Sequence, residues 1–362
     1  MPTRFRELDG LRGLAALAVV LHHVTGGYQS RYPDSPQPLA DAAWGAYGVQ
    51  LFFLISGFVI LLTAQRAQRP SDFVISRVSR LYPVYWAAVT LSIALAAAFH
   101  IAAVPQGTIV HLLNYTMIQR WLLVPNVDDV YWTLAIEMQF YALIFCLLLL
   151  TRCRLTGRTV TIVAGVWMSI ALGVAIWAGP MTRGLDPQAV AGPVKIVLNL
   201  VLAEWAPLFS VGMFACLARS RPDRRVGFGV LAGISAVLGA AVAAILHSAA
   251  QGWIVLGLAA FFLTVVARKS TSPLLFRPVQ WYGKVSYSMY IGHNLAAVVI
   301  ITLVLPYVGR NWAMLVAMVG VTLVAWGLHT IGEVHGTSLL KAALRSARTK
   351  LEARLPSRAM PS

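Results

Sequence analysis

Long apolar runs, separated by short polar stretches, dominate the chain. A transmembrane α-helix needs about 20 predominantly apolar residues, and ten segments of this sequence have that character. They are residues 9–27, 46–64, 84–104, 131–150, 159–178, 195–218, 226–247, 250–267, 285–305 and 312–333. The pattern therefore predicts an all-α, polytopic membrane protein with about ten transmembrane helices.

Three polar stretches do not read as spans. Residues 28–45 are polar and rich in proline, which favours an external loop after the first helix. Residues 105–130 mix apolar and polar groups, so they either lie along the membrane interface or re-enter the membrane. The basic, helix-prone residues from 341 onward are typical of a surface helix or a disordered end attracted to anionic lipid. We therefore expect a membrane-embedded domain over 1–335 and a basic cytoplasmic tail over 336–362.

The first apolar run has some features of a signal peptide. However, Asp9 and Arg12 intrude at its start, and no small-residue cleavage site follows His23. We therefore interpret residues 9–27 as a retained transmembrane helix.

Basic residues gather in alternate connecting segments. With the N-terminus inside, the cytoplasmic segments hold 24 of the 29 Lys and Arg residues. The other five are Arg31, Arg120, Arg183, Lys195 and Arg310. Because cytoplasmic loops collect Lys and Arg, this distribution predicts that both termini are cytoplasmic. The net charge of +16 is then a topology signal, and a nucleic-acid partner is not expected.

The composition supports the same class of protein. Hydrophobic residues make up 58% of the chain and charged residues 12%, whereas a soluble domain has about 45–50% and 25%. The three cysteines, Cys146, Cys153 and Cys216, provide neither a disulfide framework nor paired metal-ligand spacing. These numbers exclude a soluble enzyme and a disulfide-rich secreted domain.

Ionisable residues inside the predicted spans are the first candidates for function. On insertion scales each costs roughly 2.5–3.5 kcal/mol at the centre of a membrane, so such residues often serve a purpose. The set contains Asp9, Arg12, His22, His23, Glu137, Glu204, His293, His329 and Glu333.

Arg12 and His23 are eleven residues apart in the first predicted helix. At about 1.5 Å and 100° per residue, this spacing puts them roughly 16 Å apart along the axis and on nearly the same face. A neutral imidazole suits the removal of a proton from a hydroxyl, because its pKa is near the operating pH. The alternative is structural, with Arg12 as a cytoplasmic anchor and His23 hydrogen-bonded to a neighbouring helix.

Five stretches together resemble the acyltransferase-3 family of integral membrane acyltransferases. They are RELDGLRGLAALAVVLHHV at the start, YGVQLFFLISGFVI (47–60), SRVSRLYPVYW (76–86), VYWTLAIEMQFYAL (130–143) and KVSYSMYIGHN (284–294). The resemblance extends from about residue 4 to residue 335. It implies O-acyl transfer, usually of acetyl, from a CoA thioester to a hydroxyl of a carbohydrate-type acceptor. The Arg-ten-His signature of the family corresponds to Arg12 and His23, so the resemblance implies that His23 is the general base.

The resemblance also suggests a role for Arg77 and Arg80, which lie three residues apart in a basic segment. On a helical turn they share a face, where two guanidinium groups could hold the phosphates of acetyl-CoA or another acyl-CoA. Arg12 is either a third member of this group or orients the thioester. The structural alternative is that Arg77 and Arg80 anchor their helix and contact lipid phosphate.

Glu137 is a quarter to a third of the way into a predicted span, between Trp132 and Tyr141. A carboxylate there must face a cavity or a cation. It could position the imidazole of His23, hydrogen-bond the acceptor, or serve helix packing. Ser56 and Gly57 are small residues, which favour close packing of two helices. The alternative, in which Ser56 is an acylated nucleophile, lacks the GxSxG sequence context of such a serine.

Several late residues leave their roles open. His293 matches a His in the last resembling stretch, with a structural or a substrate-facing role. The family commonly has a Glu followed shortly by Pro at the end of the last span, whereas Glu333 is followed by Val334 and His335. Glu204 has no counterpart that we can assign.

We therefore expect a multi-pass O-acyltransferase of a bacterial inner membrane. His23, Glu137 and Arg12 are the catalytic candidates, Arg77, Arg80 and Arg12 bind the donor, and no metal is required. Membrane lipid and a carbohydrate or glycoconjugate are the expected partners. The sequence leaves open a covalent acyl-enzyme intermediate and a homo-oligomer. The alternative function is a transporter or flippase of a glycan or small glycoside.

Overall fold

The structure is a computed structural model that describes residues 5–101, 104–185, 190, 192–268 and 272–354. Over these residues every regular element is helical and there is no β-strand. Eight helical runs among them are long and apolar enough to cross a membrane. The runs are Ala43–Gln65, Pro70–Ala98, Asp129–Leu150, Gly157–Thr182, Pro222–Leu246, Ala249–Arg268, Arg277–Val308 and Arg310–Leu351. The predicted all-α, polytopic fold is confirmed.

These eight runs correspond to eight of the ten predicted spans. The first predicted span, 9–27, is also helical, but its run carries Asp9, Arg12 and two histidines and is not among the eight. The third span begins at Pro70, fourteen residues before the predicted start at 84. Residues 102–103, at the predicted end of that span, are outside the described residues. The cytoplasmic placement of both termini stays a prediction.

One predicted span is wrong as a single helix. Residues 195–218 form two helices, α8 (Gly192–Leu200) and α9 (Ala206–Ser220), and Leu202 between them has a φ of 53°. Pro207, near the start of α9, favours a helix beginning there. The carbonyl groups freed at the break are taken up by other helices, because Gln139 donates to Leu200 O at 2.6 Å and Trp167 donates to Val201 O at 2.7 Å.

The chain divides into two compact units. The first consists of Met1–Ala67 and Tyr131–Ser286, and the second of Gln68–Val130 and Tyr287–Ser362. Helix α12 (Arg277–Val308) begins in the first unit and ends in the second. The predicted division into residues 1–335 and 336–362 is a separate hypothesis about function and stays a prediction.

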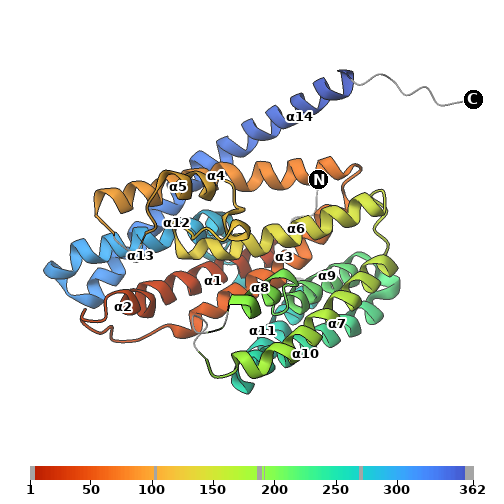
Figure 1. Cartoon of the computed structure of the whole chain (residues 1–362), viewed down its shortest axis with the longest axis horizontal. Helices are drawn as coiled ribbons and strands as arrows, with labels where there is room; N and C mark the ends of the chain where they lie inside the picture. The colour runs from red at the N-terminus through yellow and green to blue at the C-terminus, as the bar shows by residue number, and fades with distance from the viewer. Residues whose placement is uncertain (1–4, 102–103, 186–189, 191, 269–271, 355–362) are drawn as a thin grey trace, which may run out of the picture. The chain divides into compact units, whose positions relative to one another are not determined.

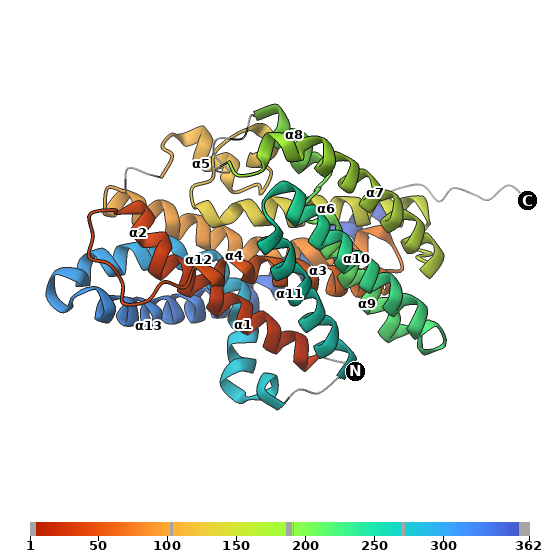
Figure 2. The ribbon, with the colours of Figure 1, turned by 90° about the horizontal axis from the view of Figure 1, so that it is seen from below.

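The first unit is built around α9. Every residue of α9 from Ala206 to Leu217 is buried, as expected for a helix that is apolar on all sides. Figure 2 shows α7, α9 and α10 side by side, and α9 also contacts α3 and α11. The other elements of this unit are α1 (Arg6–His22), η1 (His23–Gly27), α2 (Tyr28–Arg31), η2 (Ala43–Tyr47), α3 (Gly48–Gln65), α6 (Trp132–Leu150), α7 (Gly157–Thr182), η5 (Pro222–Arg224), α10 (Arg225–Leu246), α11 (Ala249–Arg268) and η6 (Ser272–Leu275).

The second unit contains α4 (Pro70–Ala98), on which the C-terminal helices pack. Residues 105–130, expected to lie along the membrane interface or to re-enter the membrane, hold the short helices α5 (Thr108–Asn114) and η3 (Gln119–Leu122) and most of η4 (Asp129–Tyr131). Helix α13 (Arg310–Leu328), the π-helical η7 (His329–Gly336) and α14 (Thr337–Arg354) follow without interruption, and α14 runs beside α4 (Figure 1). Arg348 on α14 pairs with Asp72 on α4 at 2.6 Å. Residues 355–362 of the predicted tail are outside the described residues.

Candidate functional site

Close packing on two sides fixes the rotation of α1. A side-chain carbon on Gly283 would collide with the backbone of Asp9, and one on Gly45 would collide with the carbonyl of Ala18. Because α1 makes backbone contact with both neighbours, it cannot turn about its axis without separating from them. The direction in which Arg12 and His23 face is therefore set by the fold of the first unit.

His23 is the first residue of the π-helical turn that follows α1. Its Nδ1 lies 2.9 Å from the carbonyl oxygen of Val19, one turn earlier. A carbonyl oxygen only accepts hydrogen bonds, so in the neutral ring Nδ1 carries the hydrogen and Nε2 carries the lone pair. The ring is half-buried, and π-helical turns occur frequently at functional sites. The geometry prepares Nε2 to accept a proton.

Arg12 and His23 share one uninterrupted helical segment. The α-helix extends from Arg6 to His22, and the π-helical turn begins only at His23. The spacing of about 16 Å along the axis on nearly one face is therefore retained. The neighbouring His22 packs edge-to-face on His23, with ring centroids 5.1 Å apart.

The carboxylate of Glu137, on α6, is held by two hydroxyl groups. Ser56 Oγ on α3 donates to Glu137 Oε1 at 2.9 Å, and Tyr141 OH donates to the same oxygen at 2.7 Å. Both hydrogen bonds fix the position of this carboxylate group between α3 and α6. The pairing of Glu137 with His23 stays a prediction.

Of the two hydroxyl groups that contact Glu137, only one could be predicted from the sequence. Tyr141 follows Glu137 by four residues, a spacing that puts both on one helix face, so it could have been anticipated. Ser56 lies 81 residues away on another helix, and local sequence carries no signal for that contact. The expected packing role belongs to Gly57, where α3 meets α9 backbone to backbone at Phe209 and Gly212.

Arg77 and Arg80 are in the second unit, whereas Arg12, His23 and Glu137 are in the first. Both arginines lie on the early part of α4, where the carboxylate of Asp72 accepts from the backbone N–H of Arg69 at 3.0 Å. Since this part is helical, the spacing of three residues puts them on one face. Arg77 is 8% exposed and donates to Ser76 Oγ at 3.3 Å, while Arg80 is half-buried.

Glu333 and its neighbours form a polar cluster in the second unit. Ser288 Oγ donates to Glu333 Oε1 at 2.7 Å, and His329 Nδ1 lies 3.3 Å from the same oxygen. In place of the proline that commonly follows this Glu in the family, Val334 and His335 continue the helix through η7 into α14. The departure noted in the sequence therefore corresponds to an extended helix.

His293 is fully buried, with Nδ1 2.7 Å from the carbonyl oxygen of Tyr290. Its neighbour Asn294 donates to the buried carboxylate of Asp128 at 2.7 Å. Burial raises the pKa of Asp128 to about 6, against the opposing effect of the hydrogen bond from Asn294. These contacts join the loop before η4 to the middle of α12 and favour the structural role among the two that the sequence left open for His293.

Glu204 and His247 form an ion pair at the break between α8 and α9. His247 Nε2 lies 3.1 Å from Glu204 Oε1, and each side chain is about a third exposed, at 31% and 30%. His247 is in the turn between the candidate spans Pro222–Leu246 and Ala249–Arg268. The hydrogen bond to Glu204 raises the pKa of His247 above its ordinary value, although burial opposes this shift.

We expect replacement of Glu204 by glutamine to destabilise the protein more at pH 6 than at pH 8.5. Because the pKa of His247 is raised in the folded state, the ion pair contributes fully below the ordinary histidine pKa of about 6.5 and is lost as the pH rises through the folded value. The expected loss at low pH is up to about 1 kcal/mol. Thermal unfolding of the purified variants at both pH values measures it. In a His247→Gln background the pH dependence should vanish; an equal effect of Glu204→Gln at both pH values would contradict the assignment.

In the part of the chain that the structure describes, no group of three or more His, Cys, Asp or Glu side chains is placed to hold a metal ion. The first unit offers a half-buried imidazole, a carboxylate held by two hydroxyl groups, and Arg12, and the second unit offers the pair Arg77 and Arg80. This set suits proton abstraction from a hydroxyl and recognition of a phosphorylated donor.

Comparison with known families gives one match over most of the chain. The acyltransferase-3 family model, described as an acyltransferase domain, matches residues 5–330. No solved protein structure matches the chain.

Individual bacterial relatives are distant. The exopolysaccharide production protein ExoZ of Rhizobium meliloti is 26% identical, over 71% of this chain and 78% of its own length. The acyltransferase MdmB of Streptomyces mycarofaciens is 29% identical over 56% of this chain and 53% of its own length. The peptidoglycan O-acetyltransferase OatA of Listeria monocytogenes is 23% identical over 79% of this chain and 48% of its own length. The chain thus spans about half the length of the last two.

Proposed function

Because the chain belongs to the acyltransferase-3 family of membrane acyltransferases, we propose that it transfers an acyl group, in the simplest case acetyl, from acyl-CoA to a hydroxyl of a carbohydrate. The observation that carries this proposal is the hydrogen bond from His23 Nδ1 to Val19, which leaves Nε2 as the acceptor of a proton. Relatives described as an exopolysaccharide production protein and a peptidoglycan O-acetyltransferase support a carbohydrate acceptor. The expected location is the inner membrane of a bacterium.

The proposed reaction is a direct transfer. Nε2 of His23 takes the proton of the acceptor hydroxyl as its oxygen attacks the thioester carbonyl. The resulting tetrahedral species collapses with cleavage of the carbon–sulfur bond. The CoA sulfur leaves with the electron pair and receives the proton from the imidazolium, so an ester and a free thiol are formed and His23 returns to its neutral state.

Arg12 and Glu137 complete the catalytic set of this proposal. Arg12, about 16 Å from His23 along the same helix, would orient the extended donor between the nucleotide and the thioester. Glu137, fixed by Ser56 and Tyr141, would hold either the imidazole or an acceptor hydroxyl as a positioning residue. Glu137→Gln would then change kcat if it holds the imidazole, and the KM for the acceptor if it holds the sugar.

The test uses cells that lack the gene. Mass spectrometry of their surface glycans and small glycosides, with and without complementation, compares the wild-type gene with His23→Gln. Loss of one acyl mass on deletion, restored by the wild type alone, is the expected result and would name the acceptor. If no acylated species changes and an unmodified glycan accumulates inside the cell, acyl transfer is wrong and transport takes its place.

Donor binding makes a separate prediction about Arg77 and Arg80. Arg80→Gln should raise the KM for acyl-CoA by roughly ten- to 150-fold with little change in kcat, because a charge-assisted hydrogen bond to phosphate contributes roughly 1.5–3 kcal/mol. Arg77→Gln should act in the same direction, with folding checked separately because the side chain is buried. Release of CoA thiol by purified enzyme measures both constants. Arg66→Gln, the same charge change in the same basic segment, is the matched control; an equal rise in KM there would refute specific donor binding.

A further inference from the structure

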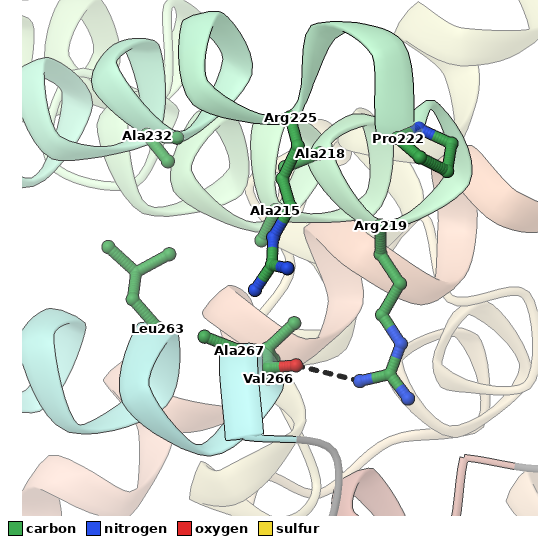
Figure 3. A pocket seen from close by; sticks show the side chains of 10 residues that line it. Ala215, Ala218, Arg219, Pro222, Arg225, Ala232, Leu263, Val266 and Ala267 are labelled. Carbon is green, nitrogen blue, oxygen red and sulfur yellow. Dashed lines mark hydrogen bonds between the residues drawn. The ribbon is translucent and has the colours of Figure 1, made fainter.

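A cavity in the first unit is separate from the residues placed in the proposed reaction. It has a volume of about 230 Å³ and lies among the ends of α9, α10 and α11. Its walls are small or apolar, including Ala215, Ala232, Leu263 and Val266, and two arginines, Arg219 and Arg225, line it. Figure 3 shows Arg225 extending from α10 into the space beside Val266 and Ala267.

Arg219 is engaged in the protein itself. It donates to the carbonyl oxygen of Val266 at 2.7 Å and pairs with Glu7 at 2.8 Å (Figure 3 shows the first contact). Val266 is in the last turn of α11, where carbonyl groups have no partner within the helix. Arg219 therefore caps α11 and ties it to α1, which makes this wall of the cavity a fixed structure.

Arg225 is different, because among the described residues it makes no recorded hydrogen bond or ion pair. It is exposed and is the first residue of α10. The segment 219–225 contains four arginines and a single carboxylate, Asp223, which pairs with Arg224 at 3.7 Å. The positive charge at the mouth of the cavity is thus incompletely balanced by the protein.

Gly229, on α10, leaves one part of the cavity open. It lines the cavity, and a side-chain carbon built on it would meet no atom within 4 Å. Gly233, one turn further along α10, is also open in this way but does not line the cavity. A larger side chain at Gly229 would therefore begin in open space and extend into the cavity.

We propose that this cavity binds the phosphate headgroup and the first part of an acyl chain of an anionic phospholipid. Arg225 would pair with the phosphate, and the walls from Gly229, Ala232 and Leu263 would take the chain. The cavity is at the basic end of spans whose charge pattern predicts the cytoplasmic side, and basic pockets between transmembrane helices at that surface suit acidic lipid headgroups. A free phosphate ion would gain nothing from the apolar walls. The proposal does not depend on the acyl transfer proposed above.

Native mass spectrometry of the full chain in detergent tests this proposal, with phosphatidylglycerol added and phosphatidylcholine as the neutral comparison. We expect one phosphatidylglycerol to be retained preferentially. Arg225→Gln should weaken its binding roughly fivefold, the loss expected for one surface cation, and Gly229→Leu should remove the bound lipid. Arg221→Gln and Gly233→Leu are matched controls that change the same kind of residue outside the cavity and should retain it.

Competition experiments distinguish a bound phospholipid from other possible ligands of the cavity. Inorganic phosphate and acyl-CoA are each added to the lipid-bound protein, and neither should displace the lipid. Displacement by inorganic phosphate would overturn the proposal in favour of a simple anion site, and displacement by acyl-CoA would assign the cavity to the donor. Equal lipid loss in Arg221→Gln and Arg225→Gln would also overturn it, because diffuse charge attraction would then be sufficient. The thermal stability of each variant shows that it is folded.

Discussion

Replacing His23 by glutamine should lower kcat for acyl transfer by about 10²- to 10⁴-fold, the usual contribution of a general base. Glutamine keeps a polar side chain of similar reach but offers no nitrogen that can take up a proton. The hydrogen bond to Val19 O occupies Nδ1, so in the neutral ring Nε2 is the nitrogen that carries the lone pair. Consumption of acyl-CoA by purified protein with a defined acceptor measures the effect, with thermal unfolding as the check on folding.

The adjacent histidine provides the control for this experiment. His22 is half-buried and packs on His23, but it points about 100° away around the helix. His22→Gln should therefore leave kcat within a few-fold of the wild type. If His22→Gln costs as much as His23→Gln, or if His23→Gln retains the wild-type rate, the assignment of the base is wrong.

The second large effect is structural and concerns the crossing of α3 and α9. Gly57 and Gly212 face each other there, and a side-chain carbon on either would collide with backbone, at Phe209 for Gly57 and at Leu54 for Gly212. Gly57→Val should therefore destabilise the protein by about 3 kcal/mol or more, because the helices must separate. The buried helix α9 would lose its packing along its whole length.

Thermal unfolding and size-exclusion chromatography in detergent measure this loss. Gly173→Val on α7 is the matched control, since a side-chain carbon there meets nothing within 4 Å. It introduces the same β-branched residue into a helix and should change stability by less than about 1 kcal/mol. If Gly57→Val unfolds at the same temperature as Gly173→Val, the crossing of α3 and α9 tolerates a side chain and the prediction is wrong.

Hydropathy and charge pattern predict most of the architecture. Eight of the ten predicted spans correspond to helices long enough to cross a membrane, because apolar length is what a spanning helix requires. The start of α4 at Pro70 is indicated by local residue preferences, which the hydropathy pattern does not include. Pro70 and Asp72 suit the first turn of a helix, and Arg77 and Arg80 consequently lie within that helix.

The break at residues 201–205 has one local signal, Pro207, which suits the first turn of a helix but does not by itself predict an interruption before it. Residues 195–218 are mostly apolar, apart from Lys195, Asn199, Glu204 and Ser210, and their hydropathy predicts a single helix. Their interruption depends on Gln139 and Trp167, which lie on other helices and satisfy the free carbonyl groups. A local pattern contains no information about partners of this kind.

The candidate site could be predicted only in part, because local sequence shows spacing within one helix but not contacts between helices. The Arg12–His23 spacing is a property of one helix and can be counted along the sequence. The π-helical turn at His23 and the contact of Ser56 with Glu137 depend on surrounding packing. The sequence therefore provides candidate residues for the chemistry, whereas the contacts that hold them are found only in the structure.

The uninterrupted helix from Arg310 to Leu351 has a mechanical consequence. Its 42 residues extend about 63 Å at 1.5 Å per residue, roughly twice the 30 Å of a bilayer's hydrocarbon core. About half of this helix therefore exceeds the length needed to cross the hydrocarbon core, and Arg348 in that half pairs with Asp72 on α4. A small tilt of α13 would therefore move residues near Leu351 further than residues near Arg310, and a fluorescent probe attached near Leu351 would detect this displacement.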